Sequence, residues 1–499
     1  MSERAKKHRL LVFVVAYNAE TTLLEVLDRI PDRLLETYDT EVLVIDDASR
    51  DQTFELGRSH AVSSQRLKLT MLQNPVNQGY GGNQKLGYEY AMRHGFDSVA
   101  LLHGDGQYAP EKLPDLVAPL AGGEAEAVFG TRMAVAGDAL KGGMPLYKYA
   151  GNKILTAFQN AVLGTRLSEF HSGFRAYSVG ALRDIPFQFN SNDFHFDTEI
   201  IIQLVLGKYR IREIPMPTYY GDEVCYVNGT KYAKDVVVAT LASRAHKAGI
   251  KYERKYDVER GEEPYDIKLG YPSSHTAAIG AVPKGARVLD LGCGPGLVGR
   301  ELKRKGCYVV GLDMREPDPE NMAKFIRWDL NDDAIPEEVF EYEYILLLDI
   351  IEHLRNPEKF VDMLRRGART SRPTIILTTA NVTFLVPRLM FLAGQFNYGK
   401  RGILDKTHTR LFTFYSMKHL LEQSGYEIVD VKGIPAPFPK ALGDGRLGRD
   451  LLRINEALIR LSKPLFSYQM YFAARPLPTV DNLLNLSVNH SEKKGGAGS

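Results

Sequence analysis

The stretch VALLHGDGQY, residues 99–108, places an acid and an amide directly after a short apolar run. Asp105 and Gln107 offer oxygen ligands of the kind that Mg²⁺ and Mn²⁺ prefer, and a bound diphosphate can complete such a site. His103 stands where an Asp-x-Asp pair has its first carboxylate. Imidazole also suits Mn²⁺, so His103 is either a metal ligand or, as we favour, a hydrogen-bonding neighbour of the ligands. We therefore predict a metal site at Asp105 and Gln107, with an ordinary turn as the alternative.

Two further polar clusters follow apolar runs, VVAYNAE and IDDASRDQT. The runs LLVFVVAY, EVLVIDDAS, LTMLQN, SVALLHG and AEAVFGT alternate with amphipathic segments, which predicts a parallel sheet flanked by helices. Ligands bind beyond the carboxyl ends of strands in such sheets. The three polar clusters are therefore expected to converge on one crevice.

A second alternation begins after residue 268, with RVLDLG, YVVGLD, KFIRWDL, YILLLD and TIILTT as its expected strands. The first of these runs into CGPGLVG, where Leu297 occupies the third glycine position of a dinucleotide-binding G-x-G-x-x-G pattern. That departure argues against a nicotinamide site. Asp313, Asp329 and Asp349 each lie at or just after the end of a later strand. We predict two doubly wound α/β domains.

Composition limits the partners. The chain has 499 residues, which favours two large domains, and its 63 Lys+Arg against 61 Asp+Glu give a net charge of +2, which does not favour nucleic acid. Three cysteines without a CxxC pair fit a reducing cytoplasm. No apolar run approaches the roughly 20 residues that span a bilayer, so peripheral contact with the inner face of a membrane is the most that we expect.

The expected organisation is a first domain at residues 1–245 and a linker at 246–268, which is charged and lacks an apolar face. A second domain is expected at 269–480, and a disordered tail at 481–499, which ends in small and polar residues.

The first roughly 240 residues resemble family 2 glycosyltransferases, within them the dolichol-phosphate mannose synthase-like group. The resemblance runs through VVAYNAETT, VLVIDDASRDQT, NQGYGGNQKLGYEYA, LLHGDGQYAPE, GTRM, EFHSGFRAYS and FDTEIIIQLVLGKYRIREIPM. It implies a glycosyltransferase A-type fold, a nucleotide-sugar donor, a polyprenyl-phosphate or glycan acceptor, and Mg²⁺ or Mn²⁺. By this resemblance the donor-binding residues are Tyr17 and Asp47 at the base and ribose, Arg132 and Arg175 at phosphate, and also His103, Asp105 and Lys231.

Catalysis in this half is expected to involve Asp105, with Asp197 in HFDTEII as a candidate base. An acceptor phosphate is already nucleophilic and needs no strong base. Asp197 also stands near the start of a helical run, where an acid favours the helix dipole.

The second half resembles class I S-adenosylmethionine-dependent methyltransferases, through RVLDLGCGPGLVG, LLLDIIEHLRNPEKF and DKTHTRLFTFYSMKHLLEQSGYEIVDVKG. The resemblance implies S-adenosylmethionine as cofactor, bound by Asp290, Gly292, Gly294, Gly296, Asp313, Asp329 and Asp349. Among these residues Asp290, Gly292 and Gly294 would approach the methionine part, Asp313 the ribose and Asp329 the adenine edge. His353 and His408 are candidate bases for methyl transfer, and each can equally be a structural histidine.

Together the two resemblances predict a bifunctional enzyme that transfers a sugar and a methyl group within one pathway. The alternative is a glycosyltransferase whose second domain binds S-adenosylmethionine as a regulatory module without catalysis. Release of S-adenosylhomocysteine distinguishes them, because only the first turns the cofactor over.

Overall fold

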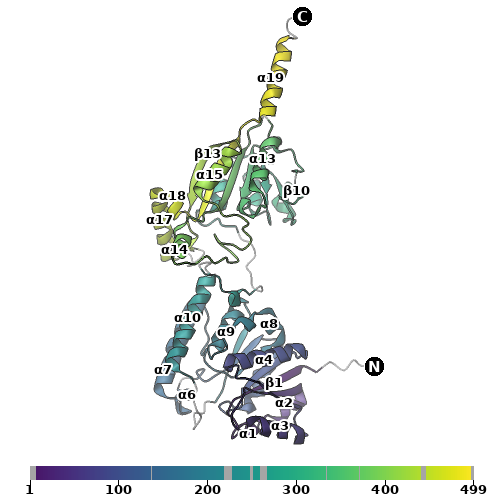
Figure 1. Ribbon diagram of the computed structural model, residues 1–499, viewed down its shortest axis with the longest axis vertical. Helices are drawn as coiled ribbons and strands as arrows, with labels where there is room; N and C mark the ends of the chain where they lie inside the picture. Colours follow the sequence, from purple (N-terminus) through teal and green to yellow (C-terminus); the bar gives the residue numbers. More distant parts are fainter. Residues whose placement is uncertain are drawn as a thin grey trace, which may run out of the picture. The chain divides into compact units, whose positions relative to one another are not determined.

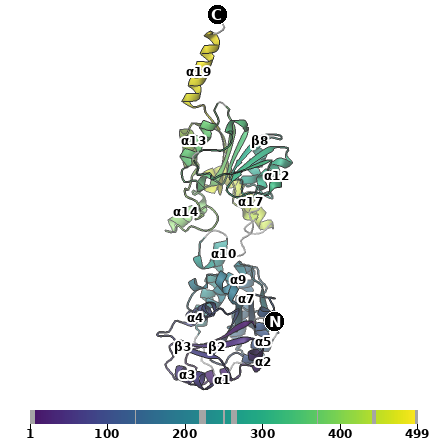
Figure 2. The ribbon, with the colours of Figure 1, turned by 90° about the vertical axis from the view of Figure 1, so that its right-hand side faces the viewer.

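The computed structural model describes residues 7–135, 137–217, 227–247, 251–258, 267–332, 334–369, 371–439 and 445–495. Its contacts divide the chain into two compact units, Met1–Lys247 with Glu253–Glu262, and Ala248–Tyr252 with Glu263–Ser499. Each unit is a sheet with helices packed on it (Figures 1 and 2). The prediction of two α/β domains is confirmed.

The first unit contains a seven-stranded sheet of order β3-β2-β1-β4-β6-β5-β7. The five predicted strands are all present, and β6 and β7 are additional. Only β6 runs against its neighbours, β4 and β5, so the sheet is mixed and not wholly parallel. Its strands are β1 (Arg9–Ala16), β2 (Asp39–Asp46), β3 (Leu69–Gln73), β4 (Ser98–His103), β5 (Ala127–Thr131), β6 (Arg175–Ser178) and β7 (Ile211–Pro215).

Alternation along β1 explains why helices cover both faces of this sheet. Leu10, Val12 and Val14 enter one apolar cluster, together with residues of α1 and α5. Leu11 and Phe13 enter the opposite cluster, together with residues of α4 and α9. Successive strand side chains point to opposite faces, so an unbroken apolar run such as LLVFVV needs cover on both.

The helices of this unit are α1 (Leu23–Asp28), α2 (Asp32–Thr37), α3 (Thr53–Ser63), α4 (Tyr80–Arg93), α5 (Leu113–Ala121), α6 (Asp138–Lys141), α7 (Leu146–Leu163), α8 (Val179–Asp184), α9 (Phe196–Leu206) and α10 (Gly229–Lys247). Short 3₁₀ turns cover η1 (Pro110–Lys112), η2 (Phe187–Phe189) and η3 (Arg254–Tyr256).

Part of the segment expected to be a linker packs on the first unit. Tyr256 is 2% exposed and contacts Ile202 of α9 and Ala239 of α10. Lys255 pairs with the buried Glu199 at 2.5 Å. The linker prediction is therefore wrong for residues 253–258, because Tyr256 and Val258 anchor a stretch that has no apolar periodicity. Residues 248–250 and 259–266 of the expected linker lie outside the described residues.

The second unit contains a seven-stranded sheet of order β10-β9-β8-β11-β12-β14-β13. Its five predicted strands are present, and β13 and β14 extend it beyond β12. Strand β14 runs antiparallel to both neighbours. The strands are β8 (Arg287–Leu291), β9 (Tyr308–Asp313), β10 (Lys324–Arg327), β11 (Tyr344–Leu348), β12 (Thr374–Ala380), β13 (Tyr426–Ile434) and β14 (Gln469–Pro476).

The helices of the second unit are α11 (Ser274–Ala281), α12 (Leu297–Arg304), α13 (Pro357–Gly367), α14 (Leu385–Leu392), α15 (Phe414–Gln423), α17 (Arg446–Leu461), α18 (Lys463–Phe466) and α19 (Val480–Gly495). Its 3₁₀ turns are η4 (Pro319–Asn321), η5 (Val339–Glu341) and η6 (Ile351–His353).

Helix α19 corrects the expectation of a disordered tail. The prediction gave most weight to the small and polar residues at the chain end. Residues 480–494 contain neither glycine nor proline, and Leu483, Leu484 and Leu486 favour a helix. Residues 496–499 of the expected tail lie outside the described residues.

Candidate active sites at the strand ends

The carboxyl ends of β1, β2 and β4 meet at one edge of the first sheet. The parallel register pairs Ala16 with Asp46 and Val15 with His103. Tyr17, Asp47 and the loop after His103 therefore begin at neighbouring points, as the sequence predicts. Tyr17 is 38% exposed at this edge.

Asp47 is buried and holds the loop that enters α4. Its carboxylate accepts hydrogen bonds from Asn74 Nδ2 at 2.7 Å, from the Gln78 amide at 2.8 Å and from the Gly79 amide at 3.0 Å. Gly79 has φ +78, and a Cβ there would lie 2.6 Å from the carbonyl oxygen of Asn192. Asp47 thus shapes the Gly-rich loop, whereas its contact with a donor base or ribose remains a prediction.

His103 ends β4 between two tyrosines. Tyr80 Oη lies 3.3 Å from His103 Nε2 and also donates to Asp197 Oδ2 at 3.0 Å. The Tyr108 ring meets the imidazole edge-on at 4.8 Å. Burial lowers the pKa of His103 and outweighs the nearby carboxylates of Asp105 and Asp197, so the ring is neutral at pH 7.

Asp105 is exposed in the turn that follows His103. Its Oδ1 accepts a hydrogen bond from the Gln107 amide at 3.1 Å. Asp105 and Gln107 therefore share one turn at this edge of the sheet, and among the described residues no hydrogen bond occupies the second carboxylate oxygen of Asp105. The metal assignment itself stays a prediction.

Asp197 lies in the first turn of α9 and is buried. Besides the bond from Tyr80, it accepts one from Gln84 Nε2 at 3.2 Å and pairs with Arg175 at 3.7 Å. The structure thus connects Asp197 to His103 through a single hydroxyl group. Sequence reasoning missed Tyr80 and Gln84, both of which lie on α4.

Arg175 is 1% exposed and is held by the fold itself. Its guanidinium donates to the carbonyl oxygens of Ser172 at 2.6 Å, Phe170 at 2.8 Å and Asp197 at 3.0 Å. These bonds brace the start of β6 against α9. The guanidinium is therefore not presented to a donor phosphate, contrary to the expectation from sequence.

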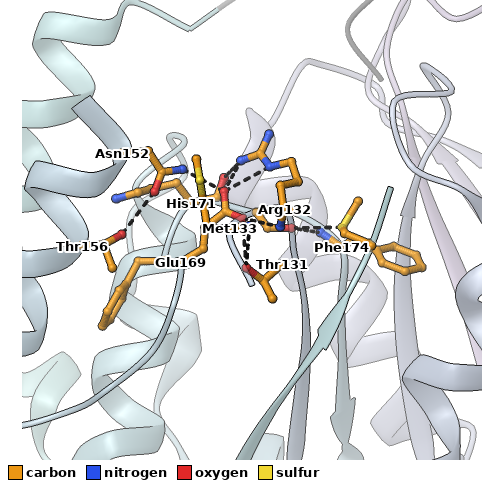
Figure 3. A network of polar contacts seen from close by, with 12 residues as sticks. Thr131, Arg132, Met133, Asn152, Thr156, Glu169, His171 and Phe174 are labelled. Carbon is orange, nitrogen blue, oxygen red and sulfur yellow. Dashed lines mark hydrogen bonds and ion pairs between the residues drawn. The ribbon is translucent and has the colours of Figure 1, made fainter. Parts of the chain in front are cut away.

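Arg132 follows β5 and pairs with Glu169, a buried acid that sequence reasoning missed (Figure 3). Glu169 accepts bonds from the Arg132 amide at 2.8 Å, from Arg132 Nε at 3.1 Å, from Arg132 Nη2, and from Asn152 Nδ2 at 2.8 Å. Burial favours a higher pKa for Glu169, but the charge and hydrogen bonds of Arg132 lower it overall. The only available sequence signal was an acid in the otherwise uncharged run SEFHSGF.

Lys231 is exposed on α10 and forms an ion pair with Asp193, just before α9. Asp193, His195 and Asp235 present ligand atoms within 4.8 Å of one another, so this second group on the first unit could also hold a cation. Donor binding by Lys231 remains a prediction.

In the second unit, Asp313 at the end of β9 holds the glycine loop that follows β8. Its carboxylate accepts the Gly294 amide at 2.8 Å and the Arg315 amide at 2.9 Å. Gly292, Gly294 and Gly296 have φ values of +75, +53 and +78, a region that favours glycine. A Cβ on Gly292 would lie 2.2 Å from Ile350 Cδ1, whereas one on Gly294 would meet nothing within 4 Å.

Asp290, in β8, is buried beneath this loop. Burial, followed by the negative charge of Asp313, raises the pKa of Asp290 to about 7. A carboxyl group so placed ionises readily when a cationic group approaches it, as the ammonium and sulfonium of S-adenosylmethionine would.

Asp329 and Asp349 occupy different environments at the same edge. Asp329 is half-buried and accepts the amide of Asn331 at 2.9 Å. Asp349 has φ +57 and accepts bonds from Thr378 Oγ1 at 2.8 Å and Ser274 Oγ at 3.3 Å. The predicted cofactor acids thus follow consecutive parallel strands of one sheet.

His353 and His408 lie together, with ring centroids 4.8 Å apart. Their Nδ1 atoms lie 3.2 Å from the Thr407 carbonyl and 3.0 Å from the Ile403 carbonyl. Each Nδ1 therefore donates, which leaves each Nε2 as an acceptor. Burial, and then Asp349, raises the pKa of the adjacent Glu352 to about 8. Glu352, His353 and His408 have ligand atoms within 4.8 Å of one another, which suits either proton transfer or a divalent ion.

These folds and strand-end sites define an enzyme built from two α/β domains. Residues 11–186 match the profile of glycosyl transferase family 2, and residues 270–431 match that of a methyltransferase domain. The chain is thus a fusion of a family 2 glycosyltransferase domain and a methyltransferase domain.

Named relatives agree with this assignment. The first half is 25% identical over 221 residues to a UDP-N-acetylglucosamine--dolichyl-phosphate N-acetylglucosaminyltransferase of Methanococcus voltae, covering 42% of this chain and 86% of that protein. It is 28% identical over 212 residues to an undecaprenyl-phosphate mannosyltransferase of Micrococcus luteus, covering 42% and 82%. The second half is 24% identical over 163 residues to a ubiquinone biosynthesis O-methyltransferase of Coxiella burnetii, covering 30% and 68%.

Proposed function

We propose that the chain is a bifunctional enzyme. The first domain transfers a sugar from a nucleotide-sugar donor to a polyprenyl-phosphate acceptor, and the second transfers a methyl group from S-adenosylmethionine to a substrate of the same pathway. The observation that carries this proposal is the convergence of Tyr17, Asp47 and the His103–Gln107 turn on one sheet edge. The names of the two polyprenyl-phosphate transferases above support the class of acceptor.

In this proposal Asp105 and Gln107 hold Mg²⁺ or Mn²⁺, which when bound neutralises the diphosphate that leaves the sugar. The exposed position of Asp105 fits that role. Neutral His103 positions Tyr80, and Tyr80 in turn fixes the Asp197 carboxylate. An acceptor phosphate attacks without deprotonation, so Asp197 orients groups at the site and does not serve as an obligatory base.

The second domain fits S-adenosylmethionine. The space beside Gly294 is open, and Asp313 fixes the loop below it. When bound, the cofactor supplies an activated methyl group. We assign proton removal from the methyl acceptor to His353 or His408, in which Nε2 is the accepting nitrogen because Nδ1 donates to a carbonyl group. We assign the domain boundary to the region after Val258.

Product mass spectrometry tests the proposal. The full chain is incubated with a panel of nucleotide sugars, a short-chain prenyl phosphate, Mn²⁺ and S-adenosylmethionine. We expect a glycosylated prenyl phosphate that Asp105→Ala fails to form, and S-adenosylhomocysteine that Asp313→Ala fails to release. Glu111→Gln, at an exposed ion pair with Arg29, is the control for both reactions. Sugar transfer without any S-adenosylhomocysteine would favour the regulatory module, and undiminished transfer by Asp105→Ala would refute the metal assignment.

A further inference from the structure

Helix α7 buries polar side chains and leaves large apolar side chains exposed. Its buried residues are Asn152, Thr156 and Gln159. Its exposed residues include Leu146, Tyr147 and Ile154, which are 71%, 73% and 69% exposed. A helix that packs on a globular core normally turns its apolar stripe inward. Leu163 and Tyr149 of α7 pack on apolar clusters of the first unit, but such contacts do not explain the exposed Leu146, Tyr147 and Ile154.

Two of the three buried polar residues, Asn152 and Thr156, belong to a hydrogen-bond network that reaches the candidate site. Asn152 donates to Glu169 at 2.8 Å, and Thr156 donates to Asn152 at 3.2 Å (Figure 3). Glu169 in turn holds Arg132 at the end of β5. One face of α7 is thus fixed to the edge of the sheet where the glycosyltransferase site lies.

The opposite face is one continuous apolar surface. At about 100° per residue, its exposed apolar positions fall within an arc of about 100°, and Lys153 lies at the margin of that arc. These positions are Leu146, Tyr147, Ala150, Ile154, Ala157 and Ala161. Val135 and Leu140, 50% and 39% exposed, precede the helix. Single exposed apolar residues are common, but a contiguous apolar face marks a surface that binds something.

The neighbouring helix also carries exposed apolar residues. Helices α7 and α10 pack side by side at the margin of the first unit (Figure 1). On α10, Val238 and Leu241 are 57% and 50% exposed. We call the exposed apolar residues given above for these two helices, with Val135 and Leu140, the α7 face.

Charge identifies the chemistry of the occupant. Residues 139–168 contain four basic side chains, Lys141, Lys148, Lys153 and Arg166, and no Asp or Glu, and of these Lys141 pairs with the preceding Asp138 at 3.3 Å. Helix α10 adds the exposed Lys234 and Arg244. An apolar helix face bordered by cations is the pattern that binds in the interface of a bilayer containing anionic lipids. A protein partner would need an apolar groove with acidic residues around it. An anionic bilayer supplies both the apolar region and the negative charge over a wide surface.

We propose that the α7 face docks the enzyme on an anionic lipid bilayer, with Leu146, Tyr147 and Ile154 in the boundary between headgroups and acyl chains. This inference rests on the proposed function, because membrane docking serves the enzyme only if its acceptor is a polyprenyl phosphate that resides in a bilayer. Among the described residues, none of the helices combines the length and apolar character needed to cross a membrane. Docking through α7 brings the site to a lipid acceptor without such a helix.

Vesicle flotation of the full chain tests the docking. Vesicles of phosphatidylcholine with one quarter phosphatidylglycerol should carry the protein, and pure phosphatidylcholine should carry much less. Leu146→Gln/Ile154→Gln should lower the partition coefficient at least about 100-fold, since burying each side chain is worth tenfold or more. Val62→Gln is the matched control, because Val62 is 85% exposed on α3 and lies outside the α7 face.

Three results would overturn the proposal. The first is equal flotation of the double variant and the wild type, or no flotation of either. The second is complete loss of flotation in Leu389→Gln/Leu392→Gln, because those residues are exposed on α14 of the second unit. The third is a dimer in vesicle-free sedimentation that the α7 double variant dissociates, which would assign the face to a second copy of the chain.

Sugar transfer to a soluble short-chain prenyl phosphate, measured without vesicles, separates this proposal from the proposed function. The double variant should keep wild-type rates there, because its two substitutions lie on the outward face of α7. Normal transfer without vesicle binding would refute only the docking, whereas vesicle binding without any transfer would refute only the proposed activity.

Discussion

Replacement of Glu169 by glutamine should destabilise the first unit by about 3–5 kcal/mol, the range measured when a buried ion pair loses one partner. The Glu169 side chain is 0% exposed, and that of Arg132 is 13% exposed. Both carboxylate oxygens accept N–H groups: Oε2 from the Arg132 amide, and Oε1 from the Arg132 side chain and Asn152. In either orientation a glutamine amide would therefore place its NH₂ group against another donor, and the guanidinium would lose its counter-charge.

The chain offers an internal reference for this measurement. Its one tryptophan is Trp328, which is buried in the second unit. Tryptophan emission during urea unfolding thus reports the unfolding of the second unit. Calorimetry or far-ultraviolet circular dichroism also detects the unfolding of the first unit. Glu169→Gln should lower the transition of the first unit and leave the midpoint of tryptophan emission unchanged.

Two further variants sharpen the result. Glu111→Gln removes a carboxylate that also binds an arginine, but this carboxylate is 53% exposed, so the loss should stay below about 1 kcal/mol. Arg132→Gln/Glu169→Gln should cost less than the sum of its single changes, because it leaves no buried charge without a partner. A loss below about 1 kcal/mol for Glu169→Gln, or an equal shift of the tryptophan transition, would refute the reasoning.

Two predictions concern the second unit. Gly292→Ala should abolish measurable S-adenosylmethionine binding in calorimetry and destabilise the unit, because its Cβ would overlap Ile350. Gly294→Ala has open space around it and should cost only about 1 kcal/mol of backbone strain. Equal losses of stability in the two variants would contradict the role of Ile350. Burial raises the pKa of Asp290 to about 7 in the folded unit. Between about pH 4 and 7 the folded, cofactor-free unit therefore binds more protons than the unfolded unit does. Its free energy of unfolding should fall by up to about 4 kcal/mol as the pH rises through that range. Urea unfolding followed by Trp328 at pH 5 and pH 7.5 should show a smaller fall in Asp290→Asn, and parallel profiles would refute the assignment.

The sequence predicted those strands that are continuous apolar runs. Strands β1, β4 and β11 are buried on both faces, and this burial requires such runs. Strand β6 was missed because it has only four residues, RAYS, and begins with an arginine. No local pattern indicates that Arg175 faces the core, where it lies 5.0 Å from the ring of Phe129 and binds carbonyl groups distant in sequence.

The site residues were predictable in position but not in partnership. Asp47, Asp105 and Asp313 follow strands whose ends the sequence indicates, and the sheet order brings them to the expected edges. Tyr80 and Glu169 were not predicted because each contacts a residue more than 20 positions away in the chain. Their roles depend on tertiary contacts and not on spacing.

The two faces of α7 show why a helix must be interpreted together with what it packs against. From sequence alone, Leu146, Tyr147 and Ile154 would be assigned to a core, and Asn152 and Thr156 to solvent. The buried Glu169 reverses this assignment, because its charge needs polar neighbours and draws Asn152 inward. The apolar residues are then turned outward by the geometry of the helix. The requirement that fixes Arg132 beside the site thereby also creates the surface that we propose meets the bilayer.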